Sequence, residues 1–431
     1  MAAFPRPPTR RTFIAGVVAA TGPSLMGNSA TGEGSDRKAP VLTGADRLAA
    51  DNFSMLRSKR VGLITNHTGR VGAERLIDVM ARAEGISLAA ILTPEHGLAG
   101  MAEAGAKVAG GADQATGIKV HSLYGSSYKP TPAMLTGLDV LLFDMQDIGT
   151  RFYTYISTMG LAMQAAAAAG LPFIVLDRPN PLGGDYISGF VLEPAFASFV
   201  GRFPIPIAHG LSVGELARMI KGERMLPGLD GLALDVIDAS GWRRGMRWPE
   251  TGRAWVATSP NIPAFESALA YPGTGLFEAT VASEGRGTDA PFLLIGHAAI
   301  DADAIADELV GAGLRGVRIA ATRVKPRAIA GVATSPRFLD RNIEAVRLNV
   351  TDAATFKPVE AGVHLLVAFH KVLAAAHAGP LVTDTKMFDR LAGTDRLRKA
   401  LTSGMKADAI IATWRSDVAR FAERRARYFA Y

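Results

Sequence analysis

Four short groups of polar residues carry side chains that could act on a substrate. Each group directly follows a run of apolar residues and carries imidazole, amide or guanidinium groups, and three of the four groups also carry carboxylic acids. The groups are Asn66-His67-Thr68-Gly69, Pro94-Glu95-His96-Gly97, Asp144-Met145-Gln146-Asp147 with Arg151, and Asp177-Arg178-Pro179-Asn180-Pro181. Side chains of these types transfer protons and bind anionic or hydroxyl-rich ligands through hydrogen bonds. The sequence therefore holds the residues of a polar active or binding site.

A fifth group, Ser283-Glu284-Gly285-Arg286-Gly287-Thr288-Asp289, alternates glycines with charged residues. Glycines allow the backbone to approach a ligand closely. Glu95 is not a cap residue, and a buried, unpaired carboxyl group is costly, so a functional role is favoured for it. If the fifth group reaches over the cleft, Glu284 and Glu95 form a carboxylate pair. Two carboxyl groups in one cleft, one protonated and one ionised, are what glycosidic bond cleavage requires.

The elements that would position these groups follow a regular order. Strands are predicted at 61–65, 88–92, 140–143 and 173–176. Helices are predicted between them at 73–83 and 152–169. Short apolar strands alternating with helices indicate a parallel sheet covered on both faces. The carboxyl ends of such strands share one edge, where ligands bind. We therefore expect a Rossmann-like α/β domain over residues 43–285, with its site at that edge.

Residues 286–431 predict a smaller α/β C-terminal domain. Its predicted helix, two strands and long helix lie at 300–310, 317–324, 346–350 and 359–376. Gly311-Ala312-Gly313-Leu314-Arg315-Gly316 matches the glycine pattern of dinucleotide-binding loops, but it follows a helix and precedes a strand, which reverses that motif. We interpret it as a helix end followed by a turn, and we expect no cofactor.

The polar groups also admit a purely structural interpretation. Loops between strands and helices use Asn, Asp, Thr and Gly as caps and turns whether or not they bind a ligand. Thr68 and Gly69 fit this interpretation best. Asp147 and Arg151 lie four residues apart and could form an ion pair on the first turn of the following helix. For this pair both interpretations stay open.

The N-terminus predicts export. Residues 1–30 have the pattern of a twin-arginine signal peptide, because Arg10-Arg11-Thr12-Phe13 precedes an apolar run that is too short to span a bilayer. Residues 31–42 predict a linker. The sequence contains no cysteine, which removes a lipoprotein anchor, disulfides and thiolate chemistry. We expect the twin-arginine translocase as a partner, a periplasmic or secreted location, and no stable membrane anchor.

The charge balance limits the other partners. The formal charge is +7, and without the three arginines of residues 1–30 it is +4. Because the basic residues are scattered outside a helical C-terminal stretch, we expect no nucleic-acid partner, while an anionic substrate is permitted. We also expect no metal, because the histidines lack the i, i+4 spacing of helical metal sites; they are His67, His96, His121 and His209.

Taken together, these motifs resemble the NamZ-type exo-β-N-acetylmuramidases, a family long catalogued as a domain of unknown function. The resemblance rests on the five groups, on Ile148-Gly149-Thr150-Arg151-Phe152-Tyr153-Thr154-Tyr155, and on Phe388-Asp389-Arg390-Leu391-Ala392-Gly393-Thr394. It covers the chain after the linker. It implies an exo-acting glycoside hydrolase that releases N-acetylmuramic acid from the non-reducing end of peptidoglycan fragments, with MurNAc-GlcNAc glycans as its substrates and its carboxylate pair in an interdomain cleft.

The resemblance also implies roles for individual residues. Glu95 becomes the leading candidate for the catalytic acid/base and Glu284 for its partner. The candidates for substrate binding are Asn66, His67, His96, Asp147, Arg151, Asp177, Arg178, Asn180, His209 and Arg286. The lactyl carboxylate of muramic acid needs a cation, for which we favour Arg286 or Arg178 over Arg151. The mechanism stays open between a carboxylate pair and attack by the substrate's own acetamido oxygen.

Two other classes of protein fit the same sequence. A periplasmic protein that binds muropeptides without cleaving them would use the same cleft. An esterase or amidase acting on cell-wall sugars would need an activated serine or a metal held by histidines from separate loops. Both classes stay as alternatives to the glycosidase.

Overall fold

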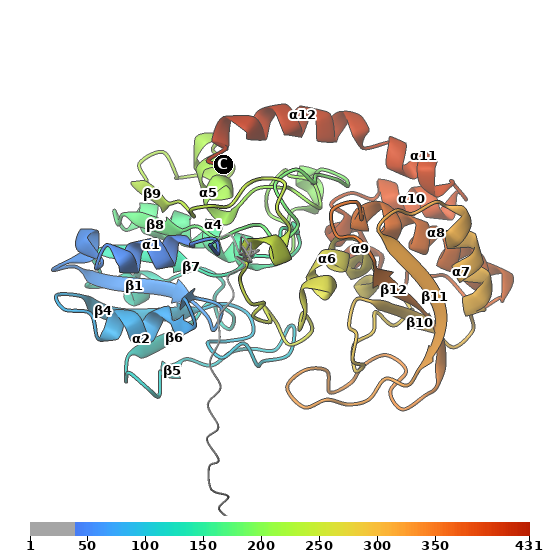
Figure 1. The fold of residues 1–431 in the computed structure, drawn as a ribbon, viewed down its shortest axis with the longest axis horizontal. Helices are drawn as coiled ribbons and strands as arrows, with labels where there is room; N and C mark the ends of the chain where they lie inside the picture. The colour runs from blue at the N-terminus through green and yellow to red at the C-terminus, as the bar shows by residue number, and fades with distance from the viewer. Residues whose placement is uncertain (1–38) are drawn as a thin grey trace, which may run out of the picture. The chain divides into compact units, whose positions relative to one another are not determined.

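The structure is a computed structural model that describes residues 39–431, which form one compact unit (Figure 1). The predicted signal peptide at 1–30 and most of the predicted linker lie outside the described residues. Residues just before Thr43, where the sequence predicts the domain to start, are already packed against it. Val41 is already buried and donates its amide to the Thr251 carbonyl at 2.9 Å.

The first half of the unit is built on a seven-stranded sheet. Its strands are β1 (Arg60–Thr65), β4 (Ser87–Thr93), β5 (Gly111–Ala112), β6 (Lys119–Ser122), β7 (Val140–Asp144), β8 (Phe173–Leu176) and β9 (Leu234–Ile237). They lie in the order β5-β6-β4-β1-β7-β8-β9, and all neighbours are parallel except β5, which is antiparallel to β6. A hairpin of β2 (Arg70–Val71) and β3 (Glu74–Arg75) follows β1. This is the doubly covered α/β sheet that the sequence predicts.

Helices cover both faces of this sheet. α1 (Gly44–Ala50) and α2 (Leu76–Ala81) pack on one face, and α3 (Pro132–Leu135), α4 (Tyr155–Ala168) and α5 (Val213–Gly222) pack on the other. Neighbouring residues of β7 confirm the alternation, because Leu142 joins the first core and Phe143 the second. The central strands are buried on both faces, which explains their continuous apolar sequence.

The second half contains a three-stranded antiparallel sheet. Its strands are β10 (Leu294–His297), β11 (Val317–Val324) and β12 (Ile343–Val350), in the order β10-β12-β11. α7 (Ala302–Gly311) packs on β11, and α8 (Pro358–Ala375) packs against α7 and against α6 (Phe265–Thr274). Among the described helices, α8 alone is long and apolar enough to cross a membrane, but more than half of it is buried inside the protein, as in a core helix.

The last helices return the chain to the first half. They are α9 (Thr385–Ala392), α10 (Arg396–Thr402), α11 (Ala407–Ala412) and α12 (Arg415–Arg425). α12 runs back over the molecule toward α5 (Figure 1). Arg425 at its end donates to the carbonyls of Gly184 at 2.8 Å and Gly210 at 2.6 Å, and the Tyr431 hydroxyl donates to the Asp177 carboxylate at 2.6 Å. The C-terminal segment therefore fastens the two halves together.

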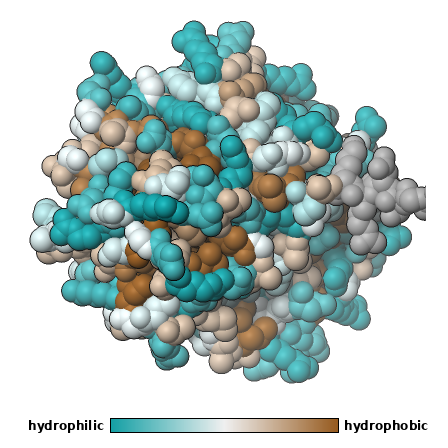
Figure 2. All heavy atoms as spheres, turned by 60° about the vertical axis from the view of Figure 1, so that its left-hand side comes forward, coloured by the Kyte–Doolittle hydropathy of each residue, from teal (hydrophilic) through white to brown (hydrophobic). Residues whose placement is uncertain are grey.

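Most predicted elements are confirmed, with differences at their ends. The helix predicted at 152–169 begins only at Tyr155, and the short strands β5, β6 and β9 carry no strong apolar run. Gly311 ends α7, and Gly313 and Gly316 have φ values of +63° and +72° before β11, so the helix end and turn are confirmed. The predicted division near residue 285 lies between the two sheets and stays a prediction. On the face shown in Figure 2, hydrophobic residues lie in separate groups among hydrophilic ones.

Candidate active site

A cavity of about 270 Å³ lies between the two halves, beyond the carboxyl end of β4. We call this cavity the site pocket. Its polar lining is formed by Glu95, His96, Tyr124, Tyr153, Thr154, Ser259, Asn261, Glu278 and Arg286. Its apolar wall includes Phe152, Val200, Ile262, Tyr271, Phe292, Met387 and Leu391. Polar groups that converge in a cavity with an apolar wall are a usual form of a small-molecule site.

Glu95 is placed by the turn that follows β4. His96 has a φ of +70° and Gly97 of +75°, so the chain reverses sharply directly after the glutamate. The left-handed conformation is unfavourable for a non-glycine residue. It is supported by a contact of 2.7 Å between His96 Nδ1 and the Ala102 carbonyl, and by the Ala102 amide, which donates to the His96 carbonyl at 3.1 Å. The turn fixes Glu95 at the pocket wall.

The carboxylate of Glu95 has partners on both oxygens. The Gly105 amide donates to Oε1 at 2.9 Å, and the Thr154 hydroxyl donates to Oε2 at 2.8 Å. Burial and the neighbouring Glu95 carboxylate together raise the pKa of the Tyr124 hydroxyl. Hydroxyl groups accept as well as donate, so Thr154 and Tyr124 can serve both the ionised and the protonated form of Glu95. Such surroundings suit a group that gives and takes a proton.

Glu278 is the second carboxyl group that lines the site pocket. It lies on the short 3-10 helix η4 (Gly275–Ala279), which continues α6. The Tyr271 hydroxyl donates to its Oε1 at 3.1 Å, and Arg286 lies 3.4 Å from the same oxygen. Burial raises the pKa of Glu278, Arg286 offsets part of that rise, and the charges of Glu284 and Glu95 add to it. Sequence reasoning did not single out this residue.

Glu284 does not line the site pocket. Its carboxylate lies between two arginines, with Oε1 at 2.9 Å from Arg286 Nε and Oε2 at 2.9 Å from Arg337 Nη1. Burial alone would lower the pKa of Arg286, but the charges of Glu278 and Glu284 raise it above its usual value. The structure thus brings Glu284 to the pocket only through Arg286, whose guanidinium it orients.

The loop that presents Arg286 requires its two glycines. Gly285 and Gly287 have φ values of +81° and +79°. A Cβ atom on Gly287 would lie 2.5 Å from the Arg327 carbonyl oxygen, and one on Gly285 would lie 2.9 Å from that of Ala290. Side chains are therefore excluded by both conformation and space. The two glycines allow close approach of this loop to protein atoms, and its approach to a ligand stays a prediction.

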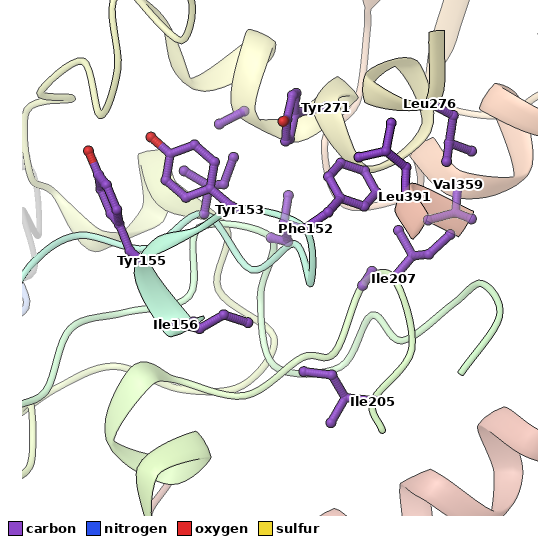
Figure 3. Packing of buried hydrophobic residues seen from close by; sticks show 14 of the residues in the cluster. Phe152, Tyr153, Tyr155, Ile156, Ile205, Ile207, Tyr271, Leu276, Val359 and Leu391 are labelled. Atoms are coloured by element: carbon purple, nitrogen blue, oxygen red, sulfur yellow. The ribbon is translucent and has the colours of Figure 1, made fainter. Parts of the chain in front are cut away.

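The pocket also contains buried polar atoms without a hydrogen-bond partner among the described residues. These are the hydroxyl oxygen of Tyr153 and the side-chain oxygen of Asn261, whose amide nitrogen donates to the Val332 carbonyl at 2.8 Å. Figure 3 shows Tyr153 beside Tyr155, with the two hydroxyl groups pointing the same way, and their rings lie 4.8 Å apart. Buried polar atoms are normally paired, so the unpaired oxygen of Asn261 could accept a hydrogen bond from a ligand.

The crevice at the carboxyl ends of β1, β7 and β8 holds several predicted site residues, but they bond to protein atoms. Arg178 makes a two-pronged ion pair with Asp144, with Nε–Oδ1 at 2.6 Å and Nη2–Oδ2 at 2.8 Å. Asp177 accepts from the hydroxyl groups of Ser212 at 2.7 Å and Tyr431 at 2.6 Å. Burial raises the pKa of Asp177 to about 6.

The predicted amide and imidazole residues of this region also bond to the protein. Asn66 accepts from the Thr68 amide at 2.9 Å, and Asn180 donates to the Leu211 carbonyl at 3.0 Å. His67 contacts the Ala257 carbonyl at 2.5 Å, and burial lowers its pKa. None of the three predicted residues lines the site pocket.

Arg151 is fully buried and bonds to the backbone. Its guanidinium donates to the carbonyls of Phe190 at 2.5 Å, Ile205 at 3.0 Å and Leu391 at 2.8 Å. Burial lowers its pKa to about 9, so it remains charged at neutral pH. The predicted first-turn pair with Asp147 does not form, because both residues precede α4. Arg151 joins the two halves, and it does not itself line the site pocket.

Asp147 and His209 form a buried contact away from the site pocket. His209 Nε2 lies 3.8 Å from Asp147 Oδ2. The Leu211 amide donates to Nδ1 at 3.2 Å, so the neutral ring carries its proton on Nε2. Burial raises the pKa of Asp147 to about 7 and lowers that of His209 to about 3. Both groups are therefore held in their neutral forms over the mildly acidic range.

Four other cavities are larger than the site pocket, and two of them lie beside polar side chains of interest. One, of about 370 Å³, lies at the crevice beside Arg178, and another, of about 810 Å³, lies under α12. Three carboxylates line the second cavity. Glu360 already accepts from Tyr186 at 2.7 Å and Ser188 at 2.9 Å, Asp185 pairs with Arg247 at 2.7 Å, and Asp408 lies 3.5 Å from His364. Within residues 39–431, no group of three or more His, Asp or Glu side chains is arranged to hold a metal ion.

Fold and site together define a two-part α/β protein with a carboxyl-lined pocket between a parallel sheet and a smaller antiparallel one. The chain belongs to the exo-β-N-acetylmuramidase NamZ family. Its residues 61–266 match the family's N-terminal model and residues 269–431 its C-terminal model. The resemblance found in the motifs is therefore confirmed.

Known proteins support the same assignment. The chain is 40% identical to the peptidoglycan β-N-acetylmuramidase NamZ of Bacillus subtilis strain 168, over 92% of each chain. Two DUF1343 family proteins from Bacteroides fragilis have solved structures of the same fold. One has a TM-score of 0.83 and 35% identity, covering 91% of this chain and all of that one. The other has a TM-score of 0.75 and 33% identity, covering 91% of this chain and 99% of that one.

Proposed function

We propose that this protein is an exo-acting glycoside hydrolase that releases N-acetylmuramic acid from the non-reducing end of peptidoglycan fragments. The observation that carries the proposal is the site pocket, where Glu95 and Glu278 line one cavity together with Arg286. The 40% identity to the Bacillus subtilis muramidase supports the same substrate. A pocket of about 270 Å³ fits one terminal sugar better than the middle of a chain, because sites for drug-sized ligands span roughly 300–1,000 Å³.

In this proposal Glu95 is the acid/base. It protonates the glycosidic oxygen as the bond to the anomeric carbon breaks, and it later takes a proton from the attacking water. Glu278 supplies the second carboxyl group, which stabilises the positive charge that develops on the sugar ring. We assign this role to Glu278 rather than to Glu284, because Glu284 lies outside the pocket lining, between Arg286 and Arg337. Glu284 then acts as a positioning residue for Arg286.

Arg286 is our candidate for the cation that binds the lactyl carboxylate. It lines the pocket, whereas Arg151 is buried against carbonyl groups and Arg178 is paired with Asp144. A guanidinium group binds a carboxylate through charge-assisted hydrogen bonds. Of the three arginines that the sequence offers for this role, Arg286 is therefore the one we propose.

The proposal is tested by product analysis. The purified protein is incubated with a muramic-acid-terminated disaccharide, and the products are identified by mass spectrometry. We expect free N-acetylmuramic acid from the wild type and none from Glu95→Gln. The wild type could instead bind the disaccharide and release no sugar, with the same affinity in Glu95→Gln. That result would indicate a wall-binding protein.

The esterase alternative depends on an activated serine. Gly210-Leu211-Ser212-Val213-Gly214 has the G-x-S-x-G spacing of serine hydrolases, but Ser212 is the N-cap of α5 and donates to Asp177 at 2.7 Å. Ser259 lines the site pocket, and among the described residues no histidine is hydrogen-bonded to it. For the metal-dependent amidase, a chelator is the test, since a carboxylate glycosidase keeps full activity in its presence.

Export is a separate part of the proposal. Arg10 and Arg11 support a twin-arginine signal in residues 1–30, and a peptidoglycan substrate lies outside the cytoplasm. Fusing these residues to a reporter that is active only after export gives the test. Export that persists after both arginines are replaced by lysine would contradict the proposal.

A further inference from the structure

Three aromatic residues form a cluster at the mouth of the site pocket. The ring of Tyr124 lies 5.2 Å from that of Tyr128 and 5.9 Å from that of Phe199, and the rings of Tyr128 and Phe199 lie 4.4 Å apart. We call these three residues the aromatic platform. Tyr124 lines the pocket, and Val200, the neighbour of Phe199, lines it as well. The platform is therefore continuous with the pocket wall.

The platform is assembled from two loops that are distant in sequence. Tyr124 and Tyr128 follow β6, where Ser127 donates its hydroxyl to the Lys129 carbonyl at 2.6 Å and accepts from the Lys129 amide at 3.1 Å. This turn holds Tyr128 in place. Phe199 comes from the segment between β8 and α5. Neither loop needs these rings for the main core, because none of the three belongs to it.

Tyr128 remains open to solvent, with 45% of its surface exposed. Among the described aromatic residues, Phe429 is the other large exposed one, at 38%, and it packs under Arg244 and Arg425. Tyr128 has no such cover. A group of aromatic rings left open beside a pocket marks a binding surface more often than a packing fault.

The chemistry of a pyranose ring matches this surface. One face of a sugar such as N-acetylglucosamine presents mainly C–H groups, which carry partial positive charge and pack on the negative face of an aromatic ring. The hydroxyl groups at the rim of the sugar stay in water. An aromatic platform therefore binds a sugar without specific hydrogen bonds.

The position of Glu95 tells which sugar reaches the platform. Its proton goes to the glycosidic oxygen, so the leaving sugar departs past the side of the pocket where Glu95 lies. Tyr124 is on that side, because it lines the site pocket together with Glu95 and with Gly105, whose amide donates to the Glu95 carboxylate at 2.9 Å. We propose that Tyr128 and Phe199, continuing from Tyr124, bind the sugar on the leaving-group side of the scissile bond, an N-acetylglucosamine unit. This inference rests on the proposed glycosidase function.

The test compares two substrates that share the terminal N-acetylmuramic acid. One is the disaccharide with N-acetylglucosamine, and the other is the β-glycosyl fluoride, whose leaving group is a single atom. Tyr128→Ala and Phe199→Ala should each lower kcat/KM for the disaccharide about tenfold, mainly through KM, and leave the fluoride unchanged. Tyr128→Phe should keep the wild-type values, because the ring does the binding. Phe429→Ala, an exposed aromatic residue outside the pocket lining, is the matched control.

The outcomes separate the two proposals. Equal losses on both substrates, or no loss on the disaccharide, would overturn the platform assignment and leave the glycosidase function standing. A wild type that cleaves neither substrate would overturn the glycosidase function and the platform assignment with it. A loss confined to the disaccharide supports both.

Discussion

Two regions of this molecule contain similar polar residues, but they differ in what those residues bind. At the crevice beyond β7 and β8, the charged groups of Arg178 and Asp177 are bound to protein: Arg178 to Asp144, and Asp177 to Ser212 and Tyr431. In the site pocket, Glu95, Glu278 and Arg286 line open space beside unpaired atoms of Tyr153 and Asn261. The comparison teaches that charged residues after parallel strands can serve the protein's own hydrogen bonds instead of a ligand, so their position alone does not identify a site.

The first way to sharpen this comparison is to remove the acid in the pocket. Glu95→Gln should lower kcat at least about 10³-fold, within the range for loss of a general acid/base, while the thermal unfolding midpoint changes little. Steady-state rates and calorimetry measure both. Glu103→Gln is the matched control, since Glu103 lies on the same loop and accepts from Thr334 across the interface at 3.0 Å. A Glu95→Gln enzyme with wild-type kcat would refute the assignment.

The second test removes the ion pair in the crevice. Arg178→Met leaves Asp144 buried without its partner, which should lower the free energy of unfolding by about 3–5 kcal/mol. The double change Asp144→Leu with Arg178→Met should cost less, because no charge is left unpaired. Denaturant unfolding measures both variants. Activity per folded molecule should stay near wild type, and a selective rise in KM would instead place Arg178 in substrate binding.

The third test separates the two remaining glutamates. Glu278→Gln should lower kcat about 10²-fold or more, because it removes the second carboxyl group from the pocket. Glu284→Gln should mainly raise KM and lower stability, since it acts through Arg286 and Arg337. The split between kcat and KM distinguishes them. If Glu278→Gln keeps its kcat, one general acid suffices, and the substrate's own acetamido oxygen becomes the nucleophile.

The fourth test concerns Arg286. Arg286→Ala should raise KM about 10- to 100-fold for a substrate with a terminal N-acetylmuramic acid, because a hydrogen bond to a charged group contributes about 1.5–3 kcal/mol. An equal rise in KM for an analogue without the lactyl carboxylate would show that Arg286 does not select that group. Arg337→Ala, which also contacts Glu284, serves as the control.

The smallest expected effect is on pH dependence, at Asp147 and His209. Folding raises the pKa of Asp147 to about 7, so between about pH 4 and 7 the folded state binds more protons there and loses stability as pH rises. Folding lowers the pKa of His209 to about 3, so between about pH 3 and 6.5 this group gains stability as pH rises. The two trends oppose each other in the wild type.

Single variants should expose each trend. Stability of Asp147→Asn should rise with pH over that range, and stability of His209→Gln should fall. Urea unfolding at a series of pH values measures this, with the wild type comparatively flat. Parallel curves for all three proteins would contradict the shifted pKa values.

The sequence predicts the fold and the place of Glu95 beside a pocket better than it predicts the other residues that line this pocket. Continuous apolar strands made the sheet predictable, and a glutamate beside Pro94 and Gly97 had no structural explanation. Glu278 was missed because Gly275–Ala279 has no polar cluster. Its place in the pocket depends on contacts with α6 and Arg286, which are made only in the folded chain. Arg151 looked like half of an i, i+4 pair, whereas its partners lie 39 to 240 residues away, which no local pattern reveals.

The return of the C-terminal segment has a consequence for how the chain folds. Asp177 at the carboxyl end of β8 obtains one of its hydrogen bonds from Tyr431, 254 residues later in the chain. Contacts of such long sequence separation form slowly, because a large loop must close before they are made. A fragment that ends after the parallel sheet would therefore retain a buried carboxylate and an uncovered edge, and we expect it to aggregate rather than fold as an independent domain.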